Sequence, residues 1–322
     1  MQLNSAGRRA ILFCILFDET VHREVSHLQE KKLLFILNPR AGRNKPHGPL
    51  FDALAILSGA GYLIRIHETA APEDAAETVA REGKSYDLII AAGGGGTLNE
   101  VISGLMRLDA PPPLGYLPQG TTNDFASSLQ IPRDPAAAAE RIAQQNVRAL
   151  DIGQWNQRSF IYVASFGAFT RSSYAASQAA KNALGHFAYI LEGMKDLNTL
   201  RPYHIRLTAD DEVLDGDYLF GAVCNSTSIG GLMKLDPERV VLDDGKFEML
   251  LVRSPKTAID LQNLVLALLN QQYDREGLVF RHVSSLHLET EEDLPWSLDG
   301  EYAPSAPVVE IANCQRALRM LL

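Results

Sequence analysis

The sequence predicts two domains, an N-terminal α/β domain built on a parallel sheet and a C-terminal β-rich domain with inserted helices. In residues 31–151, short apolar runs alternate with segments whose apolar residues are spaced by three and four. This alternation is typical of parallel strands covered by helices on both faces. From residue 152 onward the sequence carries hairpin signals between strands of alternating polarity. A chain of 322 residues that is 46% hydrophobic is long enough for two cores.

Four strands and three helices are expected in the first domain. The predicted strands are residues 33–37, 63–66, 88–92 and 114–117, and the predicted helices are residues 52–57, 72–81 and 99–108. Pro72 suits the first turn of its helix, because proline there loses no intrahelical hydrogen bond. Parallel strands in such a sheet end at a common edge, so the turns that follow them are expected to face one crevice.

The second domain is expected to begin near Asp151. Residues 155–158 read as a hairpin turn, residues 203–208, 285–290 and 308–312 as strands, and residues 172–200 and 257–271 as helices. A return of the last strand and tail onto the first domain is a common arrangement for such chains. Residues 1–30 precede the first periodic strand and form an N-terminal extension to which the sequence assigns no function.

Composition excludes several classes of protein. The net charge is −9 and no run of Lys or Arg occurs, which argues against nucleic-acid binding and against a polybasic membrane anchor. The eight histidines are scattered and form no zinc-protease or hydrolase motif. The apolar run at residues 10–17 is too short to cross a bilayer, and no small-residue cleavage site follows it. A cytoplasmic protein is expected.

Three polar, glycine-bearing turns directly follow predicted strands. They are residues 38–42 (Asn-Pro-Arg-Ala-Gly), 93–97 (Gly-Gly-Gly-Gly-Thr) and 120–124 (Gly-Thr-Thr-Asn-Asp). The four glycines allow a ligand to approach the backbone closely, and the helix that follows them offers free N–H groups to an anion. The alternative is a tight turn that needs glycine, for which one or two glycines suffice. The run therefore favours a phosphate-binding turn.

Two well-known phosphate motifs fit this turn poorly. No Gly-Lys-Ser/Thr follows, as a P-loop requires, and no acidic residue ends the next strand, as a dinucleotide fold prefers. The turn at residues 120–124 could by itself be an ordinary cap, since Asn and Asp are common at caps and turns. Its position on the same predicted sheet edge indicates nucleotide and Mg²⁺ contacts instead.

These turns resemble those of the bacterial lipid kinases that have a diacylglycerol kinase catalytic domain. The family's Asn-Pro-x-x-Gly, Gly-Gly-Asp-Gly-Thr-x-Asn-Glu and Gly-Thr-x-Asn-Asp-Phe-Ala motifs are matched, with one departure, by residues 38–42, 93–100 and 120–126. Later blocks agree in order at residues 164–169, 181–193, 242–245 and 298–301. The resemblance spans nearly the whole chain.

The resemblance implies an N-terminal domain similar to phosphofructokinase and NAD kinase, a β-sandwich-like C-terminal domain, and ATP in the cleft between them. It also implies Mg²⁺, a membrane lipid substrate such as diacylglycerol, peripheral membrane contact and a homodimer. By match to the family's motifs, the residues for ATP are Asn38, Thr69, Gly94, Gly95, Gly96, Thr97, Leu98, Asn99, Glu100 and Thr121. Asp299 matches the family's general base, and Asp244 with the main-chain carbonyls of Val241 and Lys246 matches a Mg²⁺ site.

Each of these acids also has a simpler interpretation. Asp299 precedes a glycine, and Asp-Gly is the strongest short signal for a hairpin turn. Asp244 likewise lies in an Asp-Asp-Gly sequence that is typical of turns, although turns also present the hard oxygen ligands that Mg²⁺ takes. Glu301 follows two residues after Asp299 and is a candidate for a supporting acid.

One residue departs from the family's pattern. Gly95 stands where the motif has the aspartate that is expected to organise Mg²⁺ at the phosphates. Asp124 and Asp151 remain as carboxylates that could face the same metal. Three functions therefore compete: an active lipid kinase, a catalytically impaired nucleotide- or lipid-binding homologue, and a soluble NAD kinase-like enzyme. The later blocks, above all residues 164–169 and 298–301, speak against the NAD kinase. No residue distinguishes diacylglycerol from other lipid alcohols.

Overall fold

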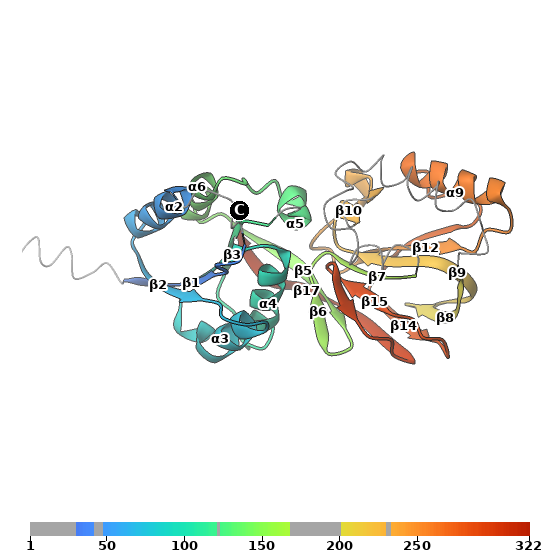
Figure 1. Cartoon of the computed structure of the whole chain (residues 1–322), viewed down its shortest axis with the longest axis horizontal. Coiled ribbons are helices and arrows are strands. Elements are labelled where there is room, and N and C mark those ends of the chain that lie inside the picture. Colours follow the sequence, from blue (N-terminus) through green and yellow to red (C-terminus); the bar gives the residue numbers. More distant parts are fainter. Residues whose placement is uncertain (1–29, 42–47, 121–122, 168–200, 230–232) are drawn as a thin grey trace, which may run out of the picture.

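The computed structural model describes residues 30–41, 48–120, 123–167, 201–229 and 233–322. Two units lie side by side along the long axis of the molecule (Figure 1). The first unit consists of β1 (Lys31–Leu37), α2 (Gly48–Gly59), β2 (Tyr62–Glu68), α3 (Asp74–Glu82), β3 (Leu88–Gly93), α4 (Gly95–Leu105), β4 (Leu114–Pro118), α5 (Asp124–Ser128) and α6 (Pro135–Ala143), with a 3-10 turn at Gly83–Ser85.

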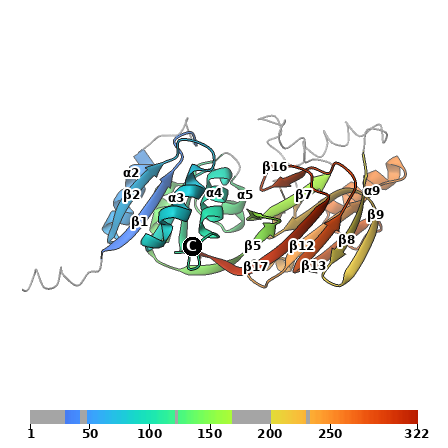
Figure 2. The ribbon, with the colours of Figure 1, turned by 90° about the horizontal axis from the view of Figure 1, so that it is seen from below.

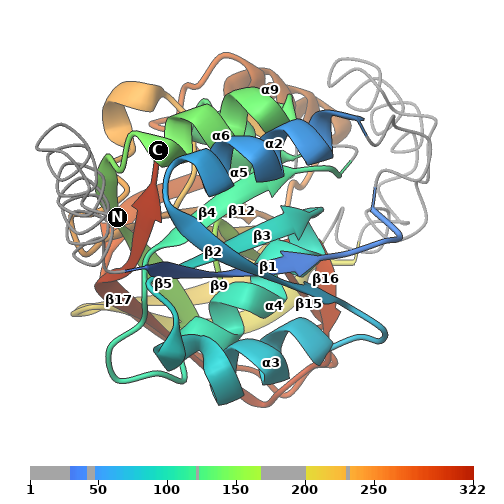
Figure 3. The same ribbon diagram turned by 90° about the vertical axis from the view of Figure 1, so that its left-hand side faces the viewer.

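A parallel sheet forms the centre of this unit, in the order β4-β3-β1-β2. Helices α2 and α6 cover one face, while α3 and α4 cover the other (Figure 3). All six residues of β3 are buried, as expected for a central strand covered on both faces. The α/β prediction for this half of the chain is confirmed.

The second unit is β-rich. It consists of β5 (Val147–Trp155), β6 (Arg158–Phe160), β7 (Val163–Gly167), β8 (Tyr203–Ala209), β9 (Glu212–Cys224), β10 (Ser228–Ile229), β11 (Met233–Lys234), β12 (Phe247–Arg253), α9 (Ala258–Leu269), β13 (Leu278–Val283), β14 (Ser285–Glu289), β15 (Trp296–Leu298), β16 (Glu301–Ala303) and β17 (Val308–Leu321), with a 3-10 turn at Pro237–Arg239. Apart from the β17–β4 pair, its strand pairs are antiparallel, and one core encloses Trp155, Phe160 and Trp296.

Strand β17 joins the two units into one sheet. It pairs antiparallel with β14 and β5, and near its end Met320 pairs parallel with Leu114 of β4. Figure 2 shows β17 and β5 running from one unit into the other. Asp151 lies within β5, so this strand runs through the predicted domain boundary without a linker.

Local sequence explains several element ends. The Asp134 side chain accepts a hydrogen bond from the Ala137 N–H and caps α6, and Thr257 and Asp260 form a capping box at the start of α9. Pro72 does not begin a helix, contrary to the sequence prediction. Helix α3 starts at Asp74, after Glu73 with a positive φ of 67°.

The other differences concern strand length and coverage. The predicted strand at residues 308–312 continues to Leu321, because a register shift between Cys314 and Leu318 lets the chain keep pairing with β5. The predicted hairpin turn at residues 155–158 is confirmed as the link between β5 and β6. The predicted helix at residues 172–200 lies outside the described residues. No described helix combines the length and apolar character needed to cross a bilayer.

Candidate active site

The carboxyl ends of the parallel strands meet at one edge of the first sheet. The Asn38 N–H, directly after β1, donates to the Ala92 carbonyl of β3 at 3.0 Å. The Gln119 N–H, directly after β4, donates to the Gly93 carbonyl at 2.8 Å, and the Thr69 N–H after β2 donates to Leu37 of β1 at 2.9 Å. The turns that the sequence placed at a common edge are thus held together by backbone hydrogen bonds.

The two glycine turns touch each other through their backbones. A Cβ atom on Gly120 would lie 3.0 Å from the Gly94 Cα and 2.7 Å from the Asn123 Oδ1, and a Cβ on Gly93 would lie 2.5 Å from the Thr97 hydroxyl. Glycine at these positions therefore has a packing reason. Gly95 has none, because a Cβ added there meets nothing within 4 Å. Within the four-glycine run, only Gly93 is closed in by close packing. A Cβ on Gly94 would make an ordinary 3.5 Å contact with Gly120, and a Cβ on Gly96 would meet only the end of the flexible Glu301 side chain.

Helix α4 begins inside this run and presents free donors. The first backbone bond of the helix runs from the Leu98 N–H to the Gly94 carbonyl, so the N–H groups of residues 95–97 have no partner within the helix. Thr97 is buried, and its Oγ1 accepts a hydrogen bond from Asn38 Nδ2 at 2.8 Å. Unpaired N–H groups and the helix dipole favour an anion at this point.

Asp299 reaches this helix from the second unit. It lies with Gly300 in the β15–β16 hairpin turn, and both residues have positive φ, 52° and 88°, as a type I′ turn requires. Its carboxylate Oδ2 accepts a hydrogen bond from Asn99 Nδ2 of α4 at 2.7 Å. Asp299 is therefore both a residue of a hairpin turn, as its sequence suggests, and a carboxylate that contacts the other unit.

The Asp299 carboxylate is fully engaged. Its Oδ1 accepts from the N–H groups of Tyr162 and Val163 at 2.9 and 3.0 Å, and its Oδ2 also accepts from the Ile161 N–H at 2.7 Å. With Asn99, these donors fill the roughly four acceptor positions of a carboxylate. Burial raises the pKa of Asp299 to about 6, and the four hydrogen bonds oppose that rise.

Glu301 lies beside the same glycines with its carboxylate free. A Cβ on Gly96 would come within 2.7 Å of Glu301 Oε1, so the carboxylate rests against the Gly96 backbone. The side chain is exposed, and within the described residues the carboxylate has no hydrogen-bond or ion-pair partner. Nearby Glu100 accepts from the Ala75 N–H at 3.2 Å, and its pKa is raised by burial first and then by the charges of Glu73 and Glu301.

Two other predicted acids, Asp151 and Asp244, have their partners elsewhere. The Asp151 carboxylate accepts hydrogen bonds from Gly245 N–H, Asn313 Nδ2 and Arg316 N–H, which ties β5 to the turn at residues 243–246 and to β17. In that turn Asp244 Oδ1 accepts from the Lys246 N–H at 3.0 Å.

The remaining predicted residues are placed as follows. Val241 is exposed, Leu98 is buried in the first core, and Asp124 is the first residue of α5. Thr121 lies outside the described residues. Of the predicted set, the structure gathers Asn38, residues 94–100, Asp299 and Glu301 at one place.

Sequence reasoning missed the residues that hold Asp299. Ile161, Tyr162 and Val163 supply three backbone donors, and the Tyr162 hydroxyl donates to the Asp299 carbonyl at 2.9 Å. Every residue except proline offers a backbone N–H, so no residue type could have signalled these contacts.

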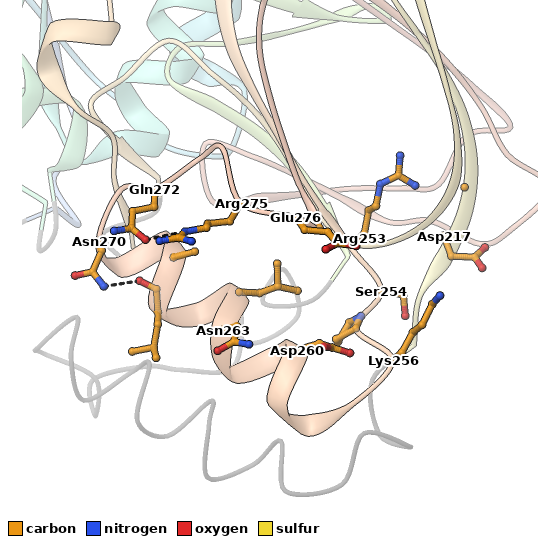
Figure 4. Close-up of a pocket in the computed structure, with 16 residues that line it drawn as sticks. Asp217, Arg253, Ser254, Lys256, Asp260, Asn263, Asn270, Gln272, Arg275 and Glu276 are labelled. Carbon is orange, nitrogen blue, oxygen red and sulfur yellow. Dashed lines mark hydrogen bonds between the residues drawn. The ribbon is translucent and has the colours of Figure 1, made fainter.

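A separate cavity of about 1150 Å³ lies in the second unit between α9 and the ends of β9 and β12 (Figure 4). Its lining mixes Arg253, Lys256 and Arg275 with Asp217 and Glu276. None of the predicted site residues lines it, so it is not part of the glycine-lined edge. Among the described residues, no three His, Cys, Asp or Glu side chains converge as a metal site.

Comparison with known proteins identifies the family. Residues 32–155 match the diacylglycerol kinase catalytic domain, and residues 163–321 match the YegS C-terminal NAD kinase beta sandwich-like domain. The diacylglycerol kinase of Bacillus subtilis (strain 168) is 34% identical over 91% of this chain and 96% of its own length. That of Staphylococcus saprophyticus is 34% identical over 86% of this chain and 91% of its own length.

Solved structures agree with the fold. A diacylglycerol kinase from Bacillus anthracis str. Sterne superposes with a TM-score of 0.71 at 24% identity, covering 91% of this chain and 96% of that chain. A second solved chain from the same strain is 26% identical, with a TM-score of 0.75 over the same shares. The parallel sheet with its glycine edge, the β-rich second unit and these matches lead to one conclusion: the chain belongs to the diacylglycerol kinase family.

Proposed function

We propose that this lipid kinase uses ATP and Mg²⁺ to phosphorylate the hydroxyl of a membrane lipid, converting diacylglycerol to phosphatidic acid. One observation carries the proposal. The 2.7 Å hydrogen bond from Asn99 to Asp299 places the carboxylate of the second unit against the helix whose N-terminus favours phosphate. Relatives that carry the name diacylglycerol kinase over most of the chain support the choice of lipid.

In the proposed reaction the lipid hydroxyl oxygen bonds to the γ-phosphorus of ATP, and the bond from that phosphorus to its bridging oxygen breaks. ADP leaves, and the hydroxyl proton passes to Asp299. The N–H groups at the start of α4 and the polar residues Asn38, Thr69, Thr97 and Thr121 bind and orient the nucleotide. The role of Gly94 and Gly96 is to let the backbone approach the phosphates.

Asp299 needs an open acceptor position to take a proton. Three of its four donors are backbone N–H groups of the consecutive residues 161–163, whereas the fourth is the Asn99 side chain. We infer that the lipid hydroxyl replaces the Asn99 amide on Oδ2 when substrate binds. Asn99 therefore holds the carboxylate in place before the hydroxyl arrives.

A divalent cation at the phosphates fits this edge, because the exposed Glu301 carboxylate lies against Gly96 and Mg²⁺ is commonly held by one or two carboxylates together with phosphate oxygens. When bound, the ion neutralises charge that develops on the transferred group. The second proposed Mg²⁺ site comprises Asp244 and the carbonyls of Val241 and Lys246. Its support is the tight turn that Gly245 forms with a φ of 81° and that the Gly245 N–H fixes to Asp151 at 2.7 Å.

A lipid substrate requires contact with a bilayer, and we propose that this contact is peripheral. We further propose a homodimer, on the resemblance to the family alone. The alternative proposal is a catalytically impaired nucleotide- or lipid-binding homologue. Its support is Gly95, which stands where the family's motif has a carboxylate.

The test is a lipid-panel kinase assay. Purified protein is incubated with labelled ATP, Mg²⁺ and dispersed diacylglycerol, phosphatidylglycerol, sphingoid and undecaprenyl-type alcohols, and NAD is included as a soluble acceptor. Labelled phosphatidic acid formed by the natural sequence supports the proposal. Absence of lipid phosphorylation even in Gly95→Asp contradicts it, phosphorylation of NAD alone supports the NAD kinase alternative, and turnover that appears only in Gly95→Asp supports the impaired homologue.

A further inference from the structure

The missing acid at position 95 raises the question of which carboxylate faces the metal of the bound nucleotide. We propose that Glu301 supplies it from the second unit. The proposal rests on the proposed function and gives a defined role to a residue in the hairpin that also carries Asp299. It depends on the position of Glu301, on its free carboxylate and on the charge around it.

Position is the first argument. Glu301 begins β16, and its Oε1 lies against the backbone of Gly96, within 2.7 Å of where a Cβ would stand. Gly95 is the next residue along the turn and faces open space. An aspartate at position 95 and the glutamate at position 301 therefore approach the same turn from opposite units of the molecule.

The free carboxylate is the second argument. All acceptor positions of Asp299 are occupied, and Asp151 is occupied by three donors around the turn at residues 243–246. Glu301 has no hydrogen-bond or ion-pair partner in the described part of the chain, and it is exposed. As far as the described residues go, its oxygens are available as hard ligands without the loss of an existing bond.

Charge is the third argument. Glu301 is close enough to Glu100 to contribute to the rise of the Glu100 pKa, after burial and the charge of Glu73. Nucleotide phosphates bound at the α4 N-terminus would add further negative charge beside these carboxylates. Two anions at such short range repel each other unless a cation lies between them. Without a metal, Glu301 should therefore oppose nucleotide binding, and with a metal it should favour it.

This change of sign defines the test. The dissociation constant of ADP is measured by calorimetry in EDTA and in excess Mg²⁺, and the ratio of the two constants is the metal coupling. In the natural protein we expect Mg²⁺ to tighten ADP binding at least about tenfold, which corresponds to about 1.4 kcal/mol. In Glu301→Gln we expect that ratio to fall to within about twofold of unity, and affinity in EDTA to stay equal or to increase.

The decisive variant is one in which a second substitution restores the metal coupling. Gly95→Asp combined with Glu301→Gln should restore the coupling to about its natural value, because the new carboxylate enters open space at the same turn. Exposed Glu140 on α6, changed to Gln, is the matched control and should leave the coupling unchanged. The line shape of Mn²⁺ in electron paramagnetic resonance, recorded with ADP, gives a direct second readout of the metal's ligands.

The outcomes separate the two proposals. If Glu301→Gln binds ADP with the coupling of the natural protein, the assignment of Glu301 is wrong while the lipid kinase proposal stands. If the natural protein binds ADP neither with nor without Mg²⁺, the proposed function itself fails. Thermal unfolding of every variant checks that the hairpin is intact, and a restored coupling in the double variant shows that loss of the fold was not the cause.

Discussion

Two buried aspartates of this protein, Asp151 and Asp299, have similar surroundings and different positions. Each carboxylate accepts hydrogen bonds from backbone N–H groups of other segments, and the residues are 1% and 8% exposed. The donors to Asp151 belong to a turn and to β17. One donor to Asp299, the Asn99 side chain, belongs instead to helix α4 of the other unit, which begins inside the glycine turn. Burial of a carboxylate does not by itself indicate a catalytic role. Here the difference between the two aspartates is that one partner of Asp299 lies on the helix at the candidate active site.

The largest effect is expected from Asp299→Asn. The amide keeps the shape of the side chain but cannot accept the hydroxyl proton, so lipid phosphorylation should fall by about 10²–10⁴-fold. Initial rates with labelled ATP and diacylglycerol measure the loss. Because the new amide N–H₂ would face backbone donors, the unfolding midpoint is measured in parallel. A variant that is folded and retains more than a tenth of the rate would contradict the role of base.

Asp151→Ala should lower stability while leaving the catalytic rate nearly unchanged, the opposite of what is expected for Asp299→Asn. Removal of the Asp151 carboxylate leaves three partly buried donors without their acceptor, which should lower the free energy of unfolding by on the order of 3 kcal/mol. The rate per folded molecule should stay within about threefold of the natural value, because Asp151 does not contact the glycine turn. Urea unfolding, combined with activity assays on the folded fraction, distinguishes a loss of stability from a loss of catalytic rate. Loss of rate in a stably folded protein would give Asp151 a catalytic part.

The pH dependence should separate activity from stability at Asp299. A base must be ionised, so kcat/KM should fall about tenfold per pH unit below the Asp299 pKa of about 6. The folded-state pKa lies above the unfolded value of 3.8, so the folded protein binds this proton more tightly. The contribution of Asp299 to stability is therefore greatest below about pH 4 and is lost as pH rises to about 6. The difference in unfolding free energy between natural protein and Asp299→Asn, measured from pH 4 to 7, checks the sign.

Gly95→Asp should have the smallest and most informative effect. Since a Cβ at position 95 meets nothing, the change should not strain the fold. A carboxylate in the first turn of α4 should stabilise the helix by about 0.5–1 kcal/mol, through the helix dipole and the removal of a glycine. We expect the rate to rise by up to about tenfold in Mg²⁺. A fall in both stability and rate would mean that the open space at position 95 is needed by a ligand.

Sequence periodicity predicted the parallel sheet well because its strands are continuous apolar runs, and residues 33–37 and 88–92 differ from β1 and β3 by at most two residues. The glycine turns were likewise predictable from composition. Partners supplied by the backbone were not, since the N–H groups of residues 161–163 that hold Asp299 look like any others. Nor did the pattern show that Gly93 and Gly120 need glycine for close packing while Gly95 does not.

Pairing that depends on distant segments was equally hidden. Residues 308–312 alternate as a strand should, but the continuation to Leu321 depends on a bulge near Arg316, which has a φ of 53°. The sequence of β17 does not itself predict that the end of the strand pairs with β4. Propensity is local, whereas the continuation of this strand pairs with β5 and β4, which lie more than 150 residues earlier in the chain.

The course of β17 has a consequence for synthesis on the ribosome. Strand β4, although made from residues 114–118, gains its outer neighbour only when residues near Met320 have emerged. The sheet of the first unit therefore keeps one edge unpaired until the last part of the chain has been made. Contacts between such distant segments slow folding and expose strand edges to aggregation. A nascent chain that stalls before this point would depend on a chaperone to cover that edge.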